Sequence, residues 1–164
     1  MPTIGKPKID TRPKQAYMGI RTITPFKGMS KTIGRLSDEM NAWVGEHNLK
    51  PSGTSFLRYH VIDMRGFMDI EFCFPFRRAR PDDGNVKAGI LAAGRYASLI
   101  YSGGGISGNR ALIEWVRAQG LEFDRWDTEQ GDNFRSRYER YLTDPKIEPR
   151  KSKWQIEVAI KLAD

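Results

Sequence analysis

The apolar and polar positions in the first half of the chain predict a strand, a helix and two further strands. Tyr17 to Thr24 is rich in β-branched and aromatic residues, and Pro25 ends this predicted strand. A helix is predicted over about Met29 to His47, because its apolar residues recur three or four positions apart. Phe56 to Asp63 and Phe67 to Phe76 predict two strands joined by a tight hairpin. The order of elements is therefore β-α-β-β.

The second half of the chain predicts the same order. Its strands are expected at Lys87 to Tyr101, as one strand or as two broken at Gly94, at Arg135 to Leu142 and at Trp154 to Leu162. A helix is expected after the glycine run at residues 103–105, which is interpreted as a flexible lip. Ser107 and Asn109 are the alternatives for the N-terminal cap of that helix.

Two pairs of similar segments indicate an internal duplication. Trp43 to Lys50 resembles Trp115 to Glu122 at an offset of 115 − 43 = 72, and it aligns Asn48 with Gly120. Asn and Gly are the residues that most readily adopt the left-handed conformation that ends a helix. Each segment is therefore predicted to contain a helix end.

The closing strands repeat at a different offset. Asp69 to Phe76 resembles Gln155 to Leu162 at an offset of 156 − 70 = 86. The second copy therefore has 86 − 72 = 14 additional residues between its helix and its last strand. We expect this additional stretch to contain Arg135 to Leu142.

The duplication predicts an α+β fold. Pseudo-repeats at about 15–80 and 85–164 would join their strands into one antiparallel sheet with two helices on one face. In the strand that begins at Met68, alternate residues such as Ile70 and Phe72 are expected to face the helices, and Glu71 to face away. The other face is expected to be open, with a central ligand cleft where the two units meet.

Length and composition agree with a single domain at residues 15–164 in the cytoplasm. Met1 to Lys14 contains three prolines and four basic residues, so it is predicted to be a flexible basic arm and not a signal peptide or a membrane segment. The single cysteine, Cys73, cannot form a disulfide within the chain, which suits a reducing compartment. The net charge is +7, but the basic residues are scattered, which argues against a nucleic acid partner.

Motifs in order along the chain resemble the GyrI-like domain family, which includes the effector-binding domains of AraC-type and MerR-type regulators. The most informative run is Tyr138-Glu139-Arg140-Tyr141-Leu142-Thr143-Asp144-Pro145. Further matches are Phe56-Leu57-Arg58-Tyr59-His60, Asp69-Ile70-Glu71 with Pro75, and Ala93-Gly94-Arg95-Tyr96-Ala97. Only 14 residues precede Gln15, so the chain resembles the stand-alone members of the family. It departs from many members at residues 101–105, where a histidine and Gly-Pro are replaced by Tyr-Ser-Gly-Gly-Gly.

The resemblance implies a cleft that binds lipophilic, often cationic or aromatic, small molecules. It also implies that Glu139 lies in this cleft among aromatic side chains. A carboxylate in an apolar cleft is costly, and a bound cation relieves that cost. Strand alternation puts Tyr141 on the same face as Glu139. The alternative is that Glu139 is a surface residue that pairs with Arg137 or Arg140.

Other residues are weaker candidates for ligand binding. Tyr59, Tyr101 and Tyr138 are candidates for the aromatic wall of the cleft. Trp115 lies on an apolar helix stripe, which favours core packing, although one edge could border the cleft. Glu71 is either a ligand-binding residue or a solvated residue at the sheet edge.

Three functions agree with these observations. The first is binding of a lipophilic small molecule for sensing or sequestration. The second is hydrolysis of reactive or strained natural products, with Glu139 and Tyr141 as the catalytic residues. The third is inhibition of DNA gyrase, like the namesake of the family, through a protein partner that the sequence does not identify. No cofactor motif is present, and two histidines with one cysteine give no metal-binding spacing.

Overall fold

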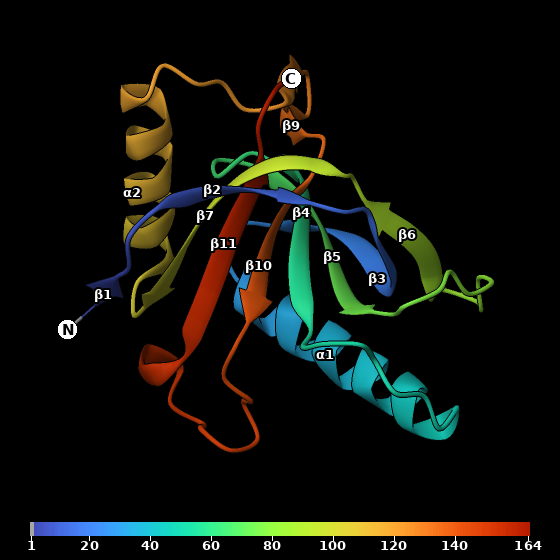
Figure 1. Ribbon diagram of the computed structural model, residues 1–164. Helices are drawn as coiled ribbons and strands as arrows, with labels where there is room; N and C mark the ends of the chain where they lie inside the picture. The colour runs from blue at the N-terminus through green and yellow to red at the C-terminus, as the bar shows by residue number, and fades with distance from the viewer. Residues whose placement is uncertain (1) are drawn as a thin grey trace.

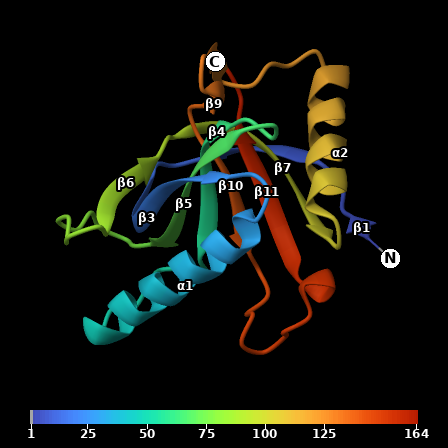
Figure 2. The same cartoon turned by 180° about the vertical axis from the view of Figure 1, so that it is seen from behind.

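Two helices lie on one face of a strongly twisted antiparallel sheet in the computed structural model, which describes residues 2–164 (Figures 1 and 2). The helices are α1 (Met29–Glu46) and α2 (Gly105–Ala118). The strands are β1 (Thr3–Ile4), β2 (Lys8–Arg12), β3 (Gln15–Pro25), β4 (Phe56–Ile62), β5 (Phe67–Pro75), β6 (Lys87–Leu91), β7 (Gly94–Ser102), β8 (Arg125–Thr128), β9 (Gly131–Phe134), β10 (Arg137–Tyr141) and β11 (Gln155–Lys161). This α+β arrangement confirms the predicted fold class.

The strand order is symmetric about the pairing of β10 with β4. Outward from this pairing lie β11 and β7 on one side and β5 and β3 on the other. Glu139 is the direct partner of Leu57 at the centre. With a twofold axis through that pair, the register aligns Tyr59 with Tyr141 and Ile70 with Ile156. The latter pair has the offset of 156 − 70 = 86 seen in the sequence.

The additional length of the second unit does not lie where the sequence suggested. β10 occupies the place of β4 in the symmetric order, so Arg137–Tyr141 belongs to the repeat. The β8–β9 hairpin lies between α2 and β10 and accounts for most of the additional residues. β9 pairs with the end of β4 through Val61 and Asn133, which places this hairpin at one end of the central strands.

Local sequence explains where the helices begin and end. In α1, Leu36 and Met40 are fully buried, as the apolar spacing predicts. Asn48 has a φ of 50° and Gly120 a φ of 71°, so the left-handed helix ends expected at these positions are confirmed. The prediction of a Ser107 or Asn109 cap is wrong, because α2 begins earlier, at Gly105, and has no side-chain cap.

The helix face of the sheet carries two apolar clusters, one beneath each helix. Under α1, Leu36 packs on residues that include Ile70 and Phe72. Under α2, Leu112 packs on residues that include Leu99 and Val158. Ile70 and Phe72 therefore face the helices, as strand alternation predicted.

The opposite face is not open, contrary to expectation. β6 and β7 are near opposite ends of the strand order, yet only Ala92 and Ala93 connect them, so the sheet must curl around this face. The curled face encloses a third cluster, whose buried members are Tyr17, Phe56, Cys73, Leu91, Tyr96, Tyr138 and Ala159. These side chains fill the space where the sequence suggested a groove.

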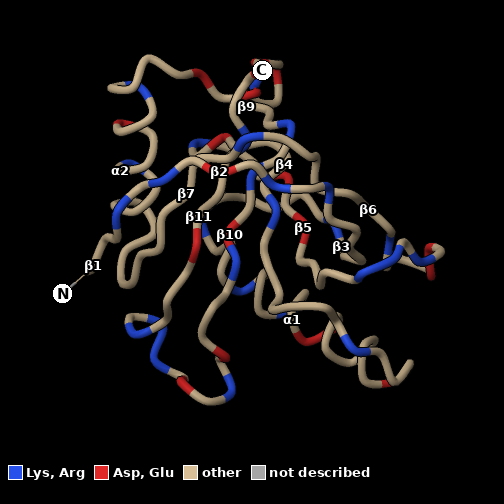
Figure 3. The backbone as a smooth tube through the Cα atoms, viewed as in Figure 1, with Lys and Arg blue, Asp and Glu red and all other residues tan. Residues whose placement is uncertain are grey.

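The N-terminal segment is ordered, so the prediction of a flexible arm over residues 1–14 is wrong for residues 3–12. β1 and β2 both pair with β7 and extend the sheet. Pro7 and Pro13 lie just outside β2, and an edge strand tolerates proline at its ends. Lys and Arg are spread over helices, strands and loops, so the positive net charge is not concentrated on one element (Figure 3).

Arg12 fixes β2 to the curled face of the sheet. Its Nη1 donates to the Tyr138 hydroxyl at 2.7 Å, and both Nη atoms donate to the Glu157 carboxylate at 3.1 and 3.2 Å. Arg140 also donates to Glu157, at 2.6 Å. Burial acts to raise the pKa of Glu157, but the hydrogen bonds and charges of Arg12 and Arg140 outweigh it and lower this pKa. No helix in residues 2–164 is long and apolar enough to cross a membrane.

We predict that Arg12→Met lowers the free energy of unfolding by about 1 to 3 kcal/mol, because it removes several charged hydrogen bonds from buried partners. Lys8→Met on the same strand is the matched control, since the Lys8 side chain is 63% exposed. Urea denaturation measures both variants. A loss no larger for Arg12→Met than for Lys8→Met would show that the side-chain hydrogen bonds of Arg12 add nothing to stability.

The same variant has a defined pH dependence. The pKa of Glu157 is lower in the folded protein, so its stabilising contribution is present above the unfolded pKa and is lost as the pH falls through the folded pKa. The difference between Arg12→Met and the parent should therefore shrink below about pH 4, near the ordinary pKa of glutamate.

Candidate functional site

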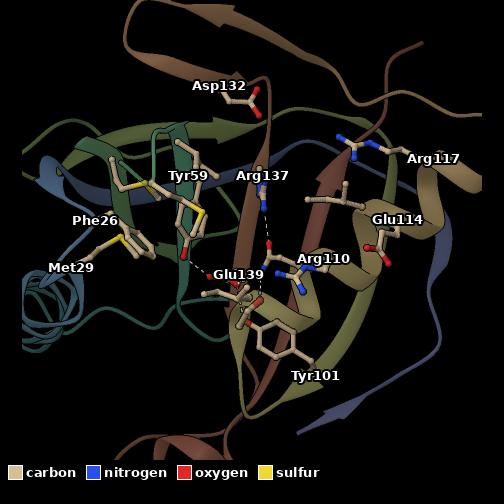
Figure 4. Close-up of a pocket in the computed structure, with 17 residues that line it drawn as sticks. Phe26, Met29, Tyr59, Tyr101, Arg110, Glu114, Arg117, Asp132, Arg137 and Glu139 are labelled. Atoms are coloured by element: carbon tan, nitrogen blue, oxygen red, sulfur yellow. Dashed lines mark hydrogen bonds between the residues drawn. The ribbon is translucent and has the colours of Figure 1, made fainter. Parts of the chain in front are cut away.

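A cleft of about 740 Å³ lies between the two helices on the helix face of the sheet (Figure 4). Its location differs from the expected groove on the opposite face. The pairing of the central strands explains this difference. Glu139 pairs with Leu57 and Val158, whose side chains face the helices, so the side chain of Glu139 faces the helices as well. The residues that line the cleft are Phe26, Met29, Tyr59, Ile62, Met64, Met68, Tyr101, Gly105, Ile106, Asn109, Arg110, Ile113, Glu114, Arg117, Asp132, Arg137 and Glu139.

The two sides of the cleft have different chemistry. Figure 4 shows Phe26, Met29 and Tyr59 on one side of Glu139, and α2 with its charged residues on the other. The first side, from the start of α1 and from β4 and β5, is aromatic and aliphatic. On the second side, α2 presents the cationic side chains of Arg110 and Arg117 at the cleft mouth, where both are exposed. The cleft is therefore amphipathic across its width.

Glu139 lies on the floor of the cleft and is 9% exposed. The Tyr59 hydroxyl donates to its Oε1 at 2.5 Å, and the Tyr101 hydroxyl donates to its Oε2 at 2.6 Å. Asn109 Nδ2 donates to Oε2 at 3.0 Å. The three donors come from β4, β7 and α2, so the carboxylate joins the two units of the fold. Three hydrogen bonds from different elements therefore fix the position of this buried side chain.

The pKa values of both tyrosines are raised, so they remain donors over a wider pH range than an exposed tyrosine. Burial raises the pKa of Tyr59 well above its usual range, and the charge of Glu139 adds to this effect. Burial and the charge of Glu139 raise the pKa of Tyr101 in the same way. Both hydroxyls therefore stay protonated even at the ordinary tyrosine pKa of about 10, and each directs its proton at the carboxylate.

Gly108 of α2 has no side chain and so leaves room for the ring of Tyr101 in this position. A Cβ atom at Gly108 would lie 2.5 Å from Cγ of Tyr101, so any other residue there would collide with the ring. Asn109, the next residue, donates to Glu139 and also to the carbonyl of Gly105. The first turns of α2 thus orient two of the three groups that bind the carboxylate. Gly105, which the sequence suggested to belong to a flexible lip at residues 103–105, is the first residue of this helix.

Arg137 lies beside Glu139 on the cleft face of β10 and is 8% exposed. Its Nη2 donates to Asn109 Oδ1 at 2.6 Å, and its guanidinium lies 4.6 Å from the centre of the Phe134 ring. Asn109 therefore connects the anionic and the cationic side chain. Burial lowers the pKa of Arg137, although the charge of Glu139 opposes this shift.

The other candidates from the sequence lie outside the cleft lining. Tyr141 shares the face of Glu139 but stacks on Phe72, with ring centres 6.1 Å apart, as part of the cluster under α1. Trp115 packs against the cluster under α2. Tyr138 and Glu71 lie on the curled face, where Tyr138 contacts Phe56 and Glu71 accepts hydrogen bonds from other side chains.

Several cleft residues were not among the candidates. Arg137 follows from strand alternation, because it lies two positions before Glu139. Asn109 was considered only as a helix cap. The apolar side, including Phe26 and Met68, gave no signal, because its residues come from separate loops and strands. Within residues 2–164, no group of three or more His, Cys, Asp or Glu side chains is arranged to hold a metal ion.

Residues 5–163 match the family described as GyrI-like small molecule binding domain, so the chain belongs to this family. Solved structures share the fold at low identity. EcmrR in a complex with DNA has a TM-score of 0.67 and 19% identity, and the match covers 97% of this chain. A hydrolase from Listeria innocua has a TM-score of 0.63 and 11% identity, covering 96% of this chain and 92% of that one.

SAV2435, whose structure contains bound tetraphenylphosphonium, has a TM-score of 0.61 and 11% identity, covering 96% of this chain and 94% of that one. The present chain spans 57% of the EcmrR chain in the DNA complex. No curated protein sequence matches it.

We predict that none of the six tyrosines ionises at its ordinary pKa of about 10 while the protein is folded. Burial is the largest cause of a raised pKa in each of them. The contribution of these tyrosines to the free energy of unfolding should be fully present below their unfolded pKa. It should fall as the pH rises above that value, because unfolding then releases protons. Phenolate absorbance and circular dichroism should change together in alkali. A phenolate transition that precedes loss of the fold would contradict this prediction.

Proposed function

We propose that the protein binds lipophilic organic cations and aromatic molecules reversibly in the cleft, as a sensing or sequestering domain. The observation that carries the proposal is Glu139, a buried carboxylate on the floor of a cleft with an apolar and aromatic side. Its three hydrogen bonds hold it in place before a ligand arrives. A ligand cation would therefore meet a charge that needs no reorganisation.

The apolar side of the cleft suits flat or bulky lipophilic groups. Phe26 and Tyr59 line this side with aromatic rings, and a cation over the face of such a ring gains about 0.5 to 2 kcal/mol. Met29, Met64 and Met68 are flexible and polarisable, so they adapt to ligands of different shape. This combination supports broad recognition by charge and hydrophobicity.

The comparisons support the same class of ligand. The family is described as binding small molecules, and the similar structure of SAV2435 contains tetraphenylphosphonium, a lipophilic cation. The location of the carboxylate and the aromatic side chains in this chain agrees with such a ligand. We extend this ligand class to the protein as a proposal.

Hydrolysis of an electrophilic ligand is the second candidate function. This function is favoured by the two tyrosine hydroxyls that donate to one carboxylate in the cleft. A carboxylate can accept a proton from water, and a hydroxyl can donate a hydrogen bond to the leaving oxygen. Tyr59 or Tyr101 would have this role by turning its hydroxyl proton from Glu139 to the leaving oxygen, in place of Tyr141, which packs away from the cleft lining. Glu139 would be the general base.

We predict that Glu139→Gln weakens binding of a cation by about 1 to 3 kcal/mol and leaves a neutral analogue nearly unchanged. Methylacridinium and acridine, at a mildly alkaline pH where acridine is neutral, form a matched fluorescent pair for titration. Glu114→Gln is the control, because Glu114 also lines the cleft but is exposed, and solvent screens its charge. Equal affinities of the parent for the two dyes would exclude a cation site.

The same Glu139→Gln variant separates the two candidate functions. If the protein is a hydrolase, the variant should still bind a strained epoxide or cyclopropane substrate but should form no product, because proton transfer is lost. Product analysis by mass spectrometry after incubation gives the result. Unchanged recovery of such substrates with the parent protein would exclude hydrolysis of this class.

A further inference from the structure

Arg137 is a buried cation for which the protein supplies few acceptors. A guanidinium has five N–H donors. Its Nη2 donates to Asn109 Oδ1, and its Nε is buried without any hydrogen-bond partner among the described residues. A buried charge in this condition is costly unless an anion accompanies it.

Glu139 and Asp132, the acidic residues whose charges act on Arg137, do not fill this role. Glu139 accepts its hydrogen bonds from two tyrosines and Asn109, and Asn109 separates it from Arg137. Asp132 pairs with Arg125 of the neighbouring strand β8. Arg137 therefore contributes a positive charge to the cleft that no direct carboxylate contact balances.

Two further arginines lie on the same side of the cleft. Arg110 and Arg117 are two turns apart on α2, and both line the cleft mouth (Figure 4). Both are exposed, and neither forms a salt bridge with any of residues 2–164. An anion that enters along α2 would meet these two positive charges, with the single exposed carboxylate of Glu114 between them in the helix, before the buried Arg137.

We propose that the cleft contains an anion subsite, with Arg137 at its floor and Arg110 and Arg117 at its mouth, that receives a carboxylate of the ligand. The inference rests on the proposed function, since the lipophilic and cationic part of the same ligand occupies the side of Phe26, Met29 and Glu139. The ligand class is thus a lipophilic zwitterion, which carries a cationic centre and an acidic group a few bonds apart.

The position of Asn109 supports a short distance between the cationic centre and the acidic group of the ligand. Its side-chain amide bonds Glu139 through Nδ2 and Arg137 through Oδ1, so one amide group separates the two charged sites. A carboxylate is favoured as the acidic group because a single negative charge balances the one buried guanidinium. Its planar shape also matches the donor geometry of arginine.

The test compares (carboxybutyl)triphenylphosphonium with its methyl ester, which keeps the phosphonium and the chain but removes the negative charge. The parent protein should bind the acid about tenfold more tightly than the ester, as expected for a charge-assisted hydrogen bond. Arg137→Gln should abolish this preference and leave the ester affinity within about twofold. Isothermal titration calorimetry measures all four affinities.

Two further variants complete the design. Arg140→Gln is the matched control, because Arg140 is on the same strand but pairs with Glu157 on the opposite face, so the preference for the acid should persist. The double variant Arg110→Gln with Arg117→Gln changes only exposed side chains and should reduce the preference even if Arg137→Gln fails to fold.

The outcomes separate this inference from the proposed function. Equal affinity of the parent for acid and ester overturns the anion subsite and leaves the cation site in place. A preference that survives both the Arg137→Gln variant and the double variant also overturns it. Failure of both probes to bind overturns the proposed function, and the zwitterion proposal with it.

Discussion

The pairing of β10 with β4 joins the two units of the fold and also creates the site. These strands are the innermost members of two three-stranded groups, so each unit buries an edge against the other. The register fixes which residues of β10 face the helices, and it places Glu139 next to Leu57 beneath the gap between α1 and α2. A shift of one residue would turn Glu139 into the curled face and Tyr138 into the cleft. The location of the carboxylate is therefore a consequence of sheet assembly.

Charged residues occupy both faces of β10, and each face handles them differently. On the curled face, Arg140 and Arg12 pair directly with Glu157, so that network is balanced within the protein. On the cleft face, Glu139 and Arg137 are joined only through Asn109, and both retain access to the cleft. The ion pairs of Glu157 with Arg12 and Arg140 support the fold. Glu139 and Arg137, which form no direct ion pair with each other, are available to a ligand.

Elements with strong periodicity were predictable from the sequence, and those that depend on tertiary pairing were not. The apolar spacing in α1 and the alternation in β5 determine which side is buried without knowledge of the partner. β8 is fully exposed, and the partly buried residues of the edge strand β2 are the charged Asp10 and Arg12, so neither strand shows an apolar residue at every second position. Similarly, alternation alone predicts that Glu139 and Tyr141 share a face, but only the packing of Phe72 against Tyr141 shows that one of them is withdrawn from the cleft.

The near-symmetry of the sheet has a consequence for how a ligand is oriented. A cleft on an exact twofold axis would offer every asymmetric molecule two poses of equal energy, and its contents would be rotationally disordered. Here the axis passes through a pair made of one carboxylate and one leucine, Glu139 and Leu57, and the β8–β9 hairpin is added on one unit alone. The two poses of a charged ligand would therefore differ in their electrostatic energy. The duplicated scaffold supplies the cleft, and the departures from its symmetry would give an asymmetric ligand one preferred orientation.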